Sequence, residues 1–296
     1  MSKTVYIVMG PTAVGKTSFA IALAQTLHTE IISADARQCF KEMNIGVARP
    51  SLSELKLVPH HFIASHSITE ELNAAFFEKW ALEKVDSLLA TKDAVVMVGG
   101  TGLYIKAFCE GLDLIPVIDP AIREGIIKQY EKLGLRWLQK ELAVKDPIYW
   151  AQGEQKNPQR LMRALEVFLG TGVSIVSFQT KKIVERPFKI VKIGLEMSRD
   201  QLYERINPRV LDMVEAGLET EVKGLHPYYH LNAFNTVGYS EWMDCFDQKI
   251  SKERVIELIQ QNTRHYAKRQ MTWFKKDHSI QWFDASTVTP HTIFLK

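Results

Sequence analysis

The sequence lacks several features that would place it in a familiar class of protein. Its 296 residues contain only three cysteines, Cys39, Cys109 and Cys245, which lie far apart. An odd, scattered set of thiols argues against a disulfide framework or a zinc site and favours a reducing compartment. No apolar run reaches the roughly 18 residues that a membrane-spanning helix needs, and the first residues show no signal-peptide pattern. We therefore expect a cytoplasmic protein without a membrane segment.

The chain also has little net charge. Its 37 Lys and Arg against 34 Asp and Glu give +3 at pH 7, which by itself does not indicate a nucleic-acid partner. The distribution is uneven, because residues 251–276 hold Glu253 and Glu257 against seven basic residues: Lys252, Arg254, Arg264, Lys268, Arg269, Lys275 and Lys276. Tyr266, Trp273 and Phe274 are interleaved with them. Basic and aromatic side chains together suit a nucleic-acid surface, although a helix with a solvated charged face explains the same pattern.

The most informative stretch present is the phosphate-loop motif GPTAVGKT, which consists of Gly10, Pro11, Thr12, Ala13, Val14, Gly15, Lys16 and Thr17. An apolar run at 5–9 predicts a buried strand before it, and helical spacing follows it. In this context the motif predicts a loop whose backbone N–H groups surround phosphate oxygens. Lys16 would reach the terminal phosphate and the Thr17 hydroxyl would bind Mg²⁺. The loop sequence does not show whether the ligand is a diphosphate or a triphosphate, and it does not show which reaction the ligand undergoes.

Two further junctions lie where strands of such a sheet end. Asp35 follows a short predicted strand at 30–33 and is expected to face the phosphate site, with capping of a helix near Arg37 as the alternative. The strand predicted at 93–98 runs into Gly99-Gly100-Thr101-Gly102, where many P-loop NTPases carry an Asp. The missing Asp argues against an ordinary ATPase. The glycines favour a ligand close to the backbone, with the Thr101 hydroxyl directed at it, over a simple turn.

The remaining patterns predict the fold class. Helical segments at 121–133, 135–143 and 158–170 replace strand patterns between residues 112 and 186, and a strand at 187–195 returns. We expect an α/β fold: a P-loop NTPase-like core (1–111 and 187–296) with a parallel sheet flanked by helices, and a helical insertion lobe (112–186). A helix opening at Ser198 carries Arg205 and Arg209 on one face, where they neutralise a phosphate or are simply solvated. Pro208 is expected to kink or shorten that helix.

Together these pieces resemble one family, the tRNA dimethylallyltransferases, also called tRNA isopentenyltransferases. The resemblance covers the chain from Val5 to about Asp284. It is carried by the strings GPTAVGKT (10–17), ISADARQ (32–38), NIGVARP (44–50), VPHHFI (58–63), VGGTGLY (98–104), PQRLMRALEV (158–167), VGY (237–239) and TRHYAKRQMTWF (263–274).

The resemblance implies transfer of a dimethylallyl group from dimethylallyl diphosphate to the exocyclic amine of the adenosine 3′ of the anticodon. Lys16 and Thr17 would hold the diphosphate and its Mg²⁺, with Asp35 as general base, Thr101 orienting the reacting groups and Arg209 neutralising the leaving diphosphate. The tRNA anticodon stem-loop would contact Asp35, Ala36, Arg37, Gln38, Thr101, Arg123, Gln159, Arg160, Leu161, Met162, Arg163, Gly238, Tyr239, Lys268, Arg269, Gln270, Trp273 and Lys275. The family's insertion lobe is mobile, and we expect a monomer without an obligate protein partner.

The sequence also departs from the family pattern, with Ala36, Phe40, Val47 and His265 where Ser, Tyr, Thr and Gln are usual. Three other interpretations of the sequence stay open. A P-loop kinase of a small metabolite would explain residues 1–110 but does not need the basic C-terminal segment. A relative that prenylates free adenine nucleotides would keep Asp35 and Thr101, and a non-catalytic RNA-binding protein would not need Lys16 and Thr17.

Overall fold

The computed structural model describes residues 3–180 and 182–294. The chain divides into two compact units, one made of the residues up to Cys109 with those from Glu185 onward, the other of Glu110–Val184. The boundaries expected from the sequence lie two residues further along the chain at each end. Within the described residues, no helix is long and apolar enough to cross a membrane.

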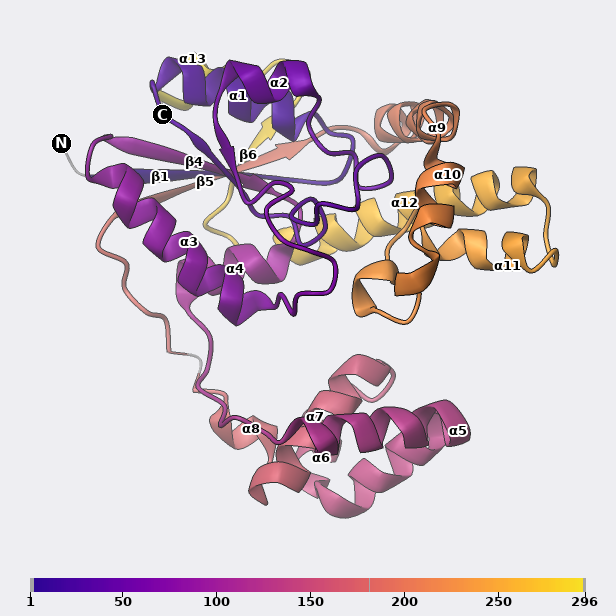
Figure 1. Ribbon diagram of the computed structural model, residues 1–296. Coiled ribbons are helices and arrows are strands. Elements are labelled where there is room, and N and C mark those ends of the chain that lie inside the picture. The colour runs from indigo at the N-terminus through magenta and orange to yellow at the C-terminus, as the bar shows by residue number, and fades with distance from the viewer. Residues whose placement is uncertain (1–2, 181, 295–296) are drawn as a thin grey trace. The chain divides into compact units, whose positions relative to one another are not determined.

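The larger unit is built on a six-stranded parallel sheet in the order β3-β2-β4-β1-β5-β6 (Figure 1). The strands are β1 (Thr4–Met9), β2 (Ile31–Ser33), β3 (His60–His61), β4 (Ala94–Gly99), β5 (Lys189–Glu196) and β6 (Gln281–Asp284). Val8 of β1 lies opposite Val98 of β4 and Ile193 of β5. Parallel strands place their carboxyl ends at one edge, so the segments after β1, β2 and β4 meet there. The sequence patterns had not indicated β6.

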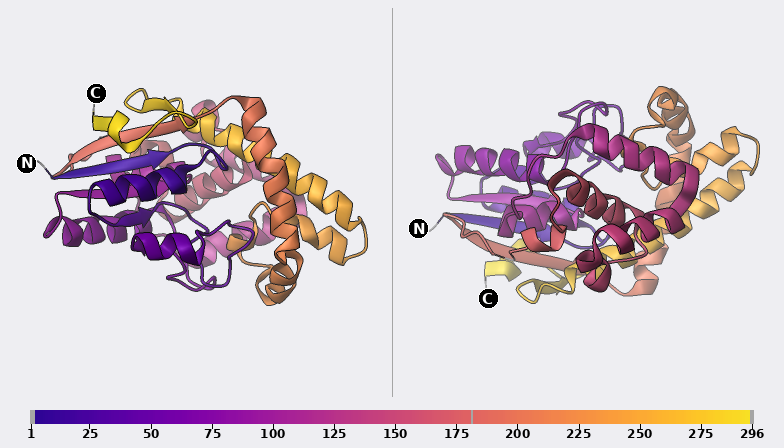
Figure 2. Two further views of the ribbon diagram at one scale, coloured as in Figure 1. Left: turned by 90° about the horizontal axis from the view of Figure 1, so that it is seen from above. Right: turned by 90° about the horizontal axis from the view of Figure 1, so that it is seen from below.

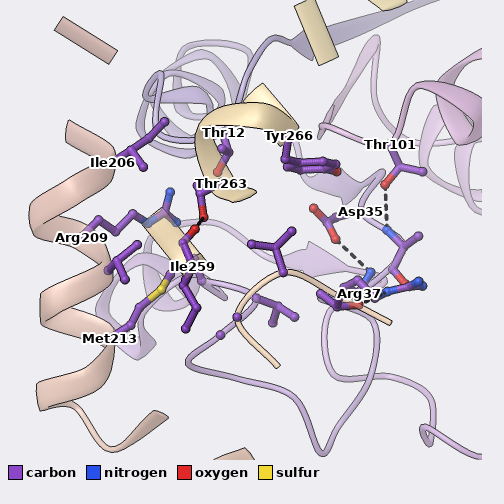
Figure 3. A pocket seen from close by; sticks show the side chains of 18 of the residues that line it. Thr12, Asp35, Arg37, Thr101, Ile206, Arg209, Met213, Ile259, Thr263 and Tyr266 are labelled. Atoms are coloured by element: carbon purple, nitrogen blue, oxygen red, sulfur yellow. Dashed lines mark hydrogen bonds between the residues drawn. The ribbon is translucent and has the colours of Figure 1, made fainter. Parts of the chain in front are cut away.

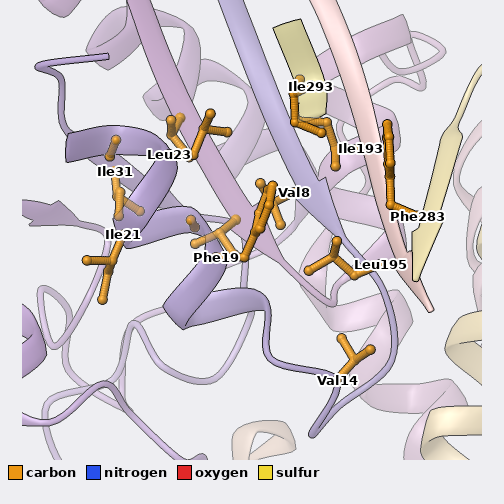
Figure 4. Close-up of a cluster of buried hydrophobic side chains, with 14 of the residues drawn as sticks. Val8, Val14, Phe19, Ile21, Leu23, Ile31, Ile193, Leu195, Phe283 and Ile293 are labelled. Atoms are coloured by element: carbon orange, nitrogen blue, oxygen red, sulfur yellow. The ribbon is translucent and has the colours of Figure 1, made fainter. Parts of the chain in front are cut away.

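Helices cover both faces of this sheet. The helix α1 (Lys16–Thr26) and the short α13 (Pro290–Phe294) lie on one face, whereas α3 (Ala74–Leu89) and α4 (Gly102–Glu110) lie on the other (Figure 1). Phe19 and Leu23 of α1 pack with Val8, Ile193 and Phe283 in a buried cluster (Figure 4). A further short helix, α2 (Leu52–Leu57), begins with a capping box between Ser51 and Glu54.

A helical part follows β5: α9 (Arg199–Glu215), α10 (Leu218–Gly224), the 3₁₀ turns η1 (His226–Tyr228), η2 (Asn232–Phe234) and η3 (Ser240–Trp242), α11 (Met243–Phe246) and α12 (Lys252–Phe274). Of the two effects expected of Pro208, a kink or a shorter helix, the shortening is not observed, because α9 continues to Glu215. Burial of Ile206 and Val210 on either side of the proline stabilises it. Asn207 also ties α9 to α12, since its side-chain oxygen accepts from Arg264 at 2.7 Å.

The smaller unit is entirely helical in its regular structure, with α5 (Pro120–Lys145), α6 (Pro147–Gln152), α7 (Pro158–Thr171) and α8 (Ile175–Phe178) (Figure 2). Gly134, with φ 73°, interrupts α5, so the two helices predicted on either side of it are confirmed. The prediction of a helix starting at Asn157-Pro158 is confirmed too, since the Asn157 side chain accepts from the N–H groups of Gln159 and Arg160. Gly172, in the left-handed region, rather than Gly170 ends α7.

Candidate active site

The phosphate loop has the backbone that an anion cradle requires. Gly10 and Gly15 have φ of 149° and 103°, and a Cβ on Gly10 would fall 2.4 Å from the Leu195 carbonyl oxygen. The helix α1 begins at Lys16 without a side-chain cap, which leaves its first N–H groups for a ligand. The Thr12 N–H is not among the available donors, because it donates to Oε1 of Gln270 at 2.8 Å.

The cationic side chains at this loop come from α1 and α9. The Lys16 Nζ donates to the Pro11 carbonyl at 2.7 Å. Burial, assisted by Arg209 and opposed by Asp35, lowers the pKa of Lys16 to about 7. Burial also lowers the pKa of Arg209, against the opposing effect of Asp35. Arg205 donates to the Val14 carbonyl at 3.3 Å, so the prediction that Arg205 and Arg209 share one face is confirmed, and that face is turned to the phosphate loop.

Two adjoining cavities meet at this point. The larger, of about 1140 Å³, is lined by Thr12, Ala13 and residues 15–18 of the phosphate loop and helix start, and by residues 44–45 and 47–52. The smaller, of about 370 Å³, is lined by polar groups of Asp35, Arg37 and Thr101 and by the apolar side chains of Ile206, Val210, Met213, Val237 and Ile259 (Figure 3). Both cavities share Thr12, Asp35, Arg209 and Tyr266. A ligand on the phosphate loop therefore reaches the smaller cavity past Asp35.

The two oxygens of Asp35 differ in their surroundings. Its Oδ1 accepts from the N–H groups of Arg37 at 2.9 Å and Gln38 at 3.2 Å. Residues 36–39 form a turn and not a helix, so the alternative that Asp35 caps a helix is wrong. The second oxygen accepts no hydrogen bond from residues 3–180 or 182–294, and Asp35 lines both cavities. One oxygen thus holds the turn while the other is available to a substrate.

Thr101 lies on the same side of the smaller cavity as Asp35 (Figure 3). Its Oγ1 accepts from the Ala36 N–H at 3.0 Å, which leaves the hydroxyl proton free to be donated to a ligand. The prediction that the neighbouring glycines let a ligand approach the backbone is wrong. A Cβ would fall 2.2 Å from the Ala34 carbonyl oxygen at Gly99, 2.2 Å from Gln270 Nε2 at Gly100 and 2.3 Å from the Trp273 ring at Gly102. Protein atoms, and not a ligand, occupy this space.

Arg37 and Gln38, both expected to contact tRNA, have internal partners. The Nε of Arg37 donates to Thr236 Oγ1 at 2.6 Å. The side-chain amide of Gln38 donates to the carbonyls of Val47 at 3.2 Å and Ala48 at 3.0 Å. These bonds attach two walls of the smaller cavity to the turn that contains Asp35. Among the departures from the family pattern, Phe40 is buried, at 3% exposure.

Glu221 is a structural residue that the sequence reasoning missed. Its carboxylate accepts from the N–H groups of Asn44 at 3.2 Å, Ile45 at 2.8 Å and Gly46 at 3.2 Å, and from the Tyr239 hydroxyl at 2.6 Å. Tyr239 is fully buried, so its side chain serves the packing of this region, and its contact with tRNA stays a prediction. Gly238 has φ 97° and donates to Glu241 at 2.9 Å, and it does line the smaller cavity. An acidic residue on a polar helix gives no sequence signal of such a role.

Tyr266 was also missed as a site residue. It lines both cavities, and its ring lies beside Asp35 (Figure 3). Burial raises its pKa, as does the nearby Asp35. Arg269 lies 5.7 Å from the centre of its ring. The helical spacing of Thr263, Tyr266 and Arg269 was the available signal, because it places all three on one face of α12.

The basic residues of α12 and its C-terminal extension fall into two groups. Four have partners: Lys252 pairs with Glu219 at 2.8 Å, Arg254 with Glu257 at 2.7 Å and Lys275 with Glu196 at 2.7 Å, and Arg264 donates to Asn207. Lys268, Arg269 and Lys276 are exposed and have no acidic partner among the described residues. Gln270 is only 6% exposed and both ends of its amide are bonded internally, so its side chain is already engaged within the protein, and its contact with tRNA stays a prediction. Trp273 is 38% exposed.

In the smaller unit, three of the residues expected to contact tRNA form one cluster. Glu166 accepts from Arg123 at 3.1 Å and from Arg163 at 2.7 Å, and Arg123 also donates to Gln159 at 2.9 Å. Arg160 is exposed beside them in sequence. Leu161 and Met162 pack into the core of this unit, at 0% and 3% exposure, so the polar side chains of the segment 159–163 are the ones left for the predicted tRNA contact.

The donor set near the phosphate loop fits Mg²⁺ bound mainly by a substrate. Within the described residues, no group of three or more His, Cys, Asp or Glu side chains has the arrangement to hold a metal ion. Mg²⁺ keeps several waters and binds through one or two protein oxygens together with substrate phosphates. The hydroxyl of Thr17, which lines the larger cavity at the start of α1, suits that mode of binding.

Comparisons with known proteins identify the family. The model described as IPP transferase matches residues 38–277. A tRNA dimethylallyltransferase of Cytophaga hutchinsonii is 45% identical over 296 residues, which cover 100% of this chain and 97% of the relative. A tRNA dimethylallyltransferase of Christiangramia forsetii is 48% identical over 284 residues, covering 96% of this chain and 94% of the relative.

Two solved structures are similar over nearly the whole chain. A full-length tRNA isopentenylpyrophosphate transferase from Bacillus halodurans has a TM-score of 0.72 and 34% identity, and the match covers 99% of this chain and 94% of that one. A eukaryotic dimethylallyltransferase acting on tRNA has a TM-score of 0.76 and 25% identity, with 96% and 74% covered. The parallel sheet with its phosphate loop is thus a P-loop NTPase-like core, and the chain belongs to the IPP transferase family.

Proposed function

We propose that this chain transfers a dimethylallyl group from dimethylallyl diphosphate to the exocyclic amine of the adenosine 3′ of the anticodon in tRNA. The observation that carries the proposal is the meeting of two cavities at Asp35 and Arg209. The phosphate loop lines one cavity, and hydrogen-bonding and apolar groups that suit an adenine ring line the other. The names of the family members, tRNA dimethylallyltransferases, supply the transferred group and the tRNA acceptor.

The donor diphosphate would bind at the N-terminus of α1, where free N–H groups and the helix dipole favour an anion. Lys16 and Arg209 would add positive charge from two sides. The Thr17 hydroxyl would hold Mg²⁺, which when bound would supply further positive charge for the leaving group. A diphosphate that leaves as an anion is stabilised by charges already in place, and such electrostatic stabilisation is usually the largest catalytic contribution.

In the chemical step, the C1–O bond of dimethylallyl diphosphate breaks and its electron pair leaves with the diphosphate. The adenine amine forms a bond to C1 and loses one proton to the second carboxylate oxygen of Asp35. That amine is a poor nucleophile because its lone pair is delocalised into the ring, so a base at this position is required. The Thr101 hydroxyl, which keeps its proton available, would orient the adenine ring, and the Tyr266 ring offers a surface on which adenine could stack.

The tRNA backbone would meet the exposed cations Lys268, Arg269 and Lys276 of the larger unit, whose positive charges have no acidic partner in the described chain. In the smaller unit the cluster of Arg123, Gln159 and Arg163 offers donors held in place by Glu166. We expect the protein to bind tRNA as a monomer, with contacts from each of the two units. With tRNA as the acceptor, the reaction would take place in the cytoplasm.

The competing readings predict different substrate pairs, so one experiment separates them. The protein is incubated with Mg²⁺ and four combinations: dimethylallyl diphosphate with tRNA, dimethylallyl diphosphate with AMP, ATP with tRNA, and ATP alone. Mass spectrometry of the digested tRNA should show a prenylated adenosine only in the first mixture. Strong ATP hydrolysis that does not depend on tRNA, or prenylation of AMP in preference to tRNA, would contradict the proposal.

A further inference from the structure

A buried glutamine of α12 joins the two loops between which the reaction would occur. The Oε1 of Gln270 accepts from the Thr12 N–H of the phosphate loop at 2.8 Å. Its Nε2 donates to the Gly100 carbonyl at 3.0 Å, in the segment that precedes Thr101. These partners lie 258 and 170 residues away in the sequence. Both polar ends of the side chain are therefore satisfied, and each bond goes to a different loop of the site.

The glycines of the Thr101 turn are shaped for this contact. A Cβ on Gly100 would fall 2.2 Å from Gln270 Nε2, and one on Gly102 would fall 2.3 Å from the Trp273 ring. Gln270 and Trp273 are three residues apart on α12, so they present to the same face of the helix. That face packs directly against the turn on both sides of Thr101. Gly100 has no positive φ, so space for α12, and not backbone conformation, accounts for the glycine.

The connection fixes the separation between two sets of groups. On one side are the N–H donors and Lys16 of the phosphate loop, and on the other is the Thr101 hydroxyl, held by Ala36 beside Asp35. The Thr12 N–H and the Gly100 carbonyl each bond to the Gln270 amide and not to each other, so this amide links the phosphate loop to the Thr101 turn. Displacement of a reacting group by about 1 Å can slow a reaction roughly a hundredfold.

We propose that Gln270 is a positioning residue that holds the phosphate loop and the Thr101 turn in register for transfer, and that it is not a tRNA contact. The inference rests on the proposed function, because the transfer reaction is what the register serves. It assigns separate tasks to neighbouring residues of α12. Exposed Lys268 and Arg269 would bind tRNA, whereas buried Gln270 orders the reacting loops.

The test compares Gln270→Met, which keeps the length of the side chain but removes both hydrogen bonds, with Gln261→Met. Gln261 is an exposed glutamine of the same helix and serves as the matched control. The single-turnover rate is measured with saturating dimethylallyl diphosphate and tRNA, and the Kd for tRNA is measured separately. We expect Gln270→Met to react roughly 10- to 100-fold more slowly with a tRNA Kd within about twofold of wild type, and Gln261→Met to match wild type in both.

A second variant reaches the same contact from the other side. Gly100→Ala leaves Gln270 in place but pushes its amide away, and should slow single turnover to a similar extent. Gln270→Ala alone and Gly100→Ala combined with Gln270→Ala complete a double-mutant cycle. The double variant lacks the clash, so its single-turnover rate should exceed the rate expected from multiplying the two single effects. This pair tests the proposal even if Gln270→Met does not fold, which circular dichroism would reveal.

The outcomes are distinguishable. A normal single-turnover rate in Gln270→Met, with or without weaker tRNA binding, would overturn the positioning role, as would an equal loss in Gln261→Met or strictly multiplicative effects in the Gly100 pair. If the wild-type protein itself does not prenylate tRNA under these conditions, the proposed function fails and this inference fails with it, a result distinct from a normal rate in the variant.

Discussion

The unusual state of Lys16 makes donor binding dependent on pH in a direction that the structure specifies. Burial, with a further contribution from Arg209, lowers the pKa of Lys16 to about 7. In the absence of a ligand, a large fraction of the protein at pH 7 to 8 therefore has a neutral Lys16. A diphosphate brought next to this side chain favours the ammonium form and raises its pKa again.

The sign and size of the effect follow from linkage. Below pH 7 Lys16 is charged with and without the ligand, so its protonation does not affect the affinity. Above pH 7 binding must take up a proton, so the affinity falls as the pH rises, by at most tenfold per pH unit, until the pH reaches the pKa of the complex. Each unit of pKa difference corresponds to about 1.4 kcal/mol of binding free energy.

Isothermal titration calorimetry with dimethylallyl diphosphate between pH 7 and 9 measures this directly, because buffers of different ionisation enthalpy reveal the number of protons taken up. This range lies above the last ionisation of a phosphate group, near 6, so the ligand charge is nearly constant. Lys16→Arg, which stays charged throughout, is the control and should take up no proton. A Kd for wild type that is constant from pH 7 to 9, or proton release on binding, would refute the reasoning.

Three other predictions follow from the contacts. Combined Lys268→Ala and Arg269→Ala substitutions should weaken binding of all tRNAs and reduce the slope of log Kd against log salt concentration by about one per lost contact, with little change in turnover at saturating tRNA. Filter binding at several salt concentrations measures this slope, and an unchanged Kd would show that these residues are solvated and do not bind tRNA. Gly46→Ala places a Cβ 2.4 Å from the Tyr239 ring and should lower the free energy of unfolding by about 1–3 kcal/mol, whereas Gly224→Ala, which faces open space, should not; equal denaturation midpoints would contradict it. Transfer RNA should protect the Gln159–Arg163 segment from hydrogen exchange while dimethylallyl diphosphate alone does not, and equal protection by both would argue against a tRNA contact there.

Much of the fold was predictable because it depends on local patterns. The strand–loop–helix context of the phosphate loop, the buried strands at 5–9 and 93–98 and the helices either side of Gly134 all carry short-range signals. The strand β6 was not predicted, since four residues, Gln281–Asp284, give too short an alternation. Pro208 was misjudged for a different reason: packing of α9 against α12 outweighs the one hydrogen bond that proline removes.

The site was predictable where the motif itself makes the contact and not where distant segments do. Asp35 and Thr101 lie at strand ends, so topology alone brings them together. The glycines at 99, 100 and 102 were misread because the atoms that fill their space come from Ala34, Gln270 and Trp273. Glu221 was invisible for the same reason, because its partners are the backbone N–H groups of a loop more than a hundred residues away.

The most direct test of the central claim concerns the free oxygen of Asp35. Asp35→Asn keeps an oxygen that can accept from Arg37 and Gln38, so the turn should survive, but it removes the carboxylate that would take the proton of the adenine amine. With both substrates saturating, we predict that the variant folds, binds dimethylallyl diphosphate and tRNA, and transfers the prenyl group in a single turnover roughly a hundredfold or more slowly than wild type. A single-turnover rate within a few-fold of wild type would contradict the assignment of Asp35 as the base.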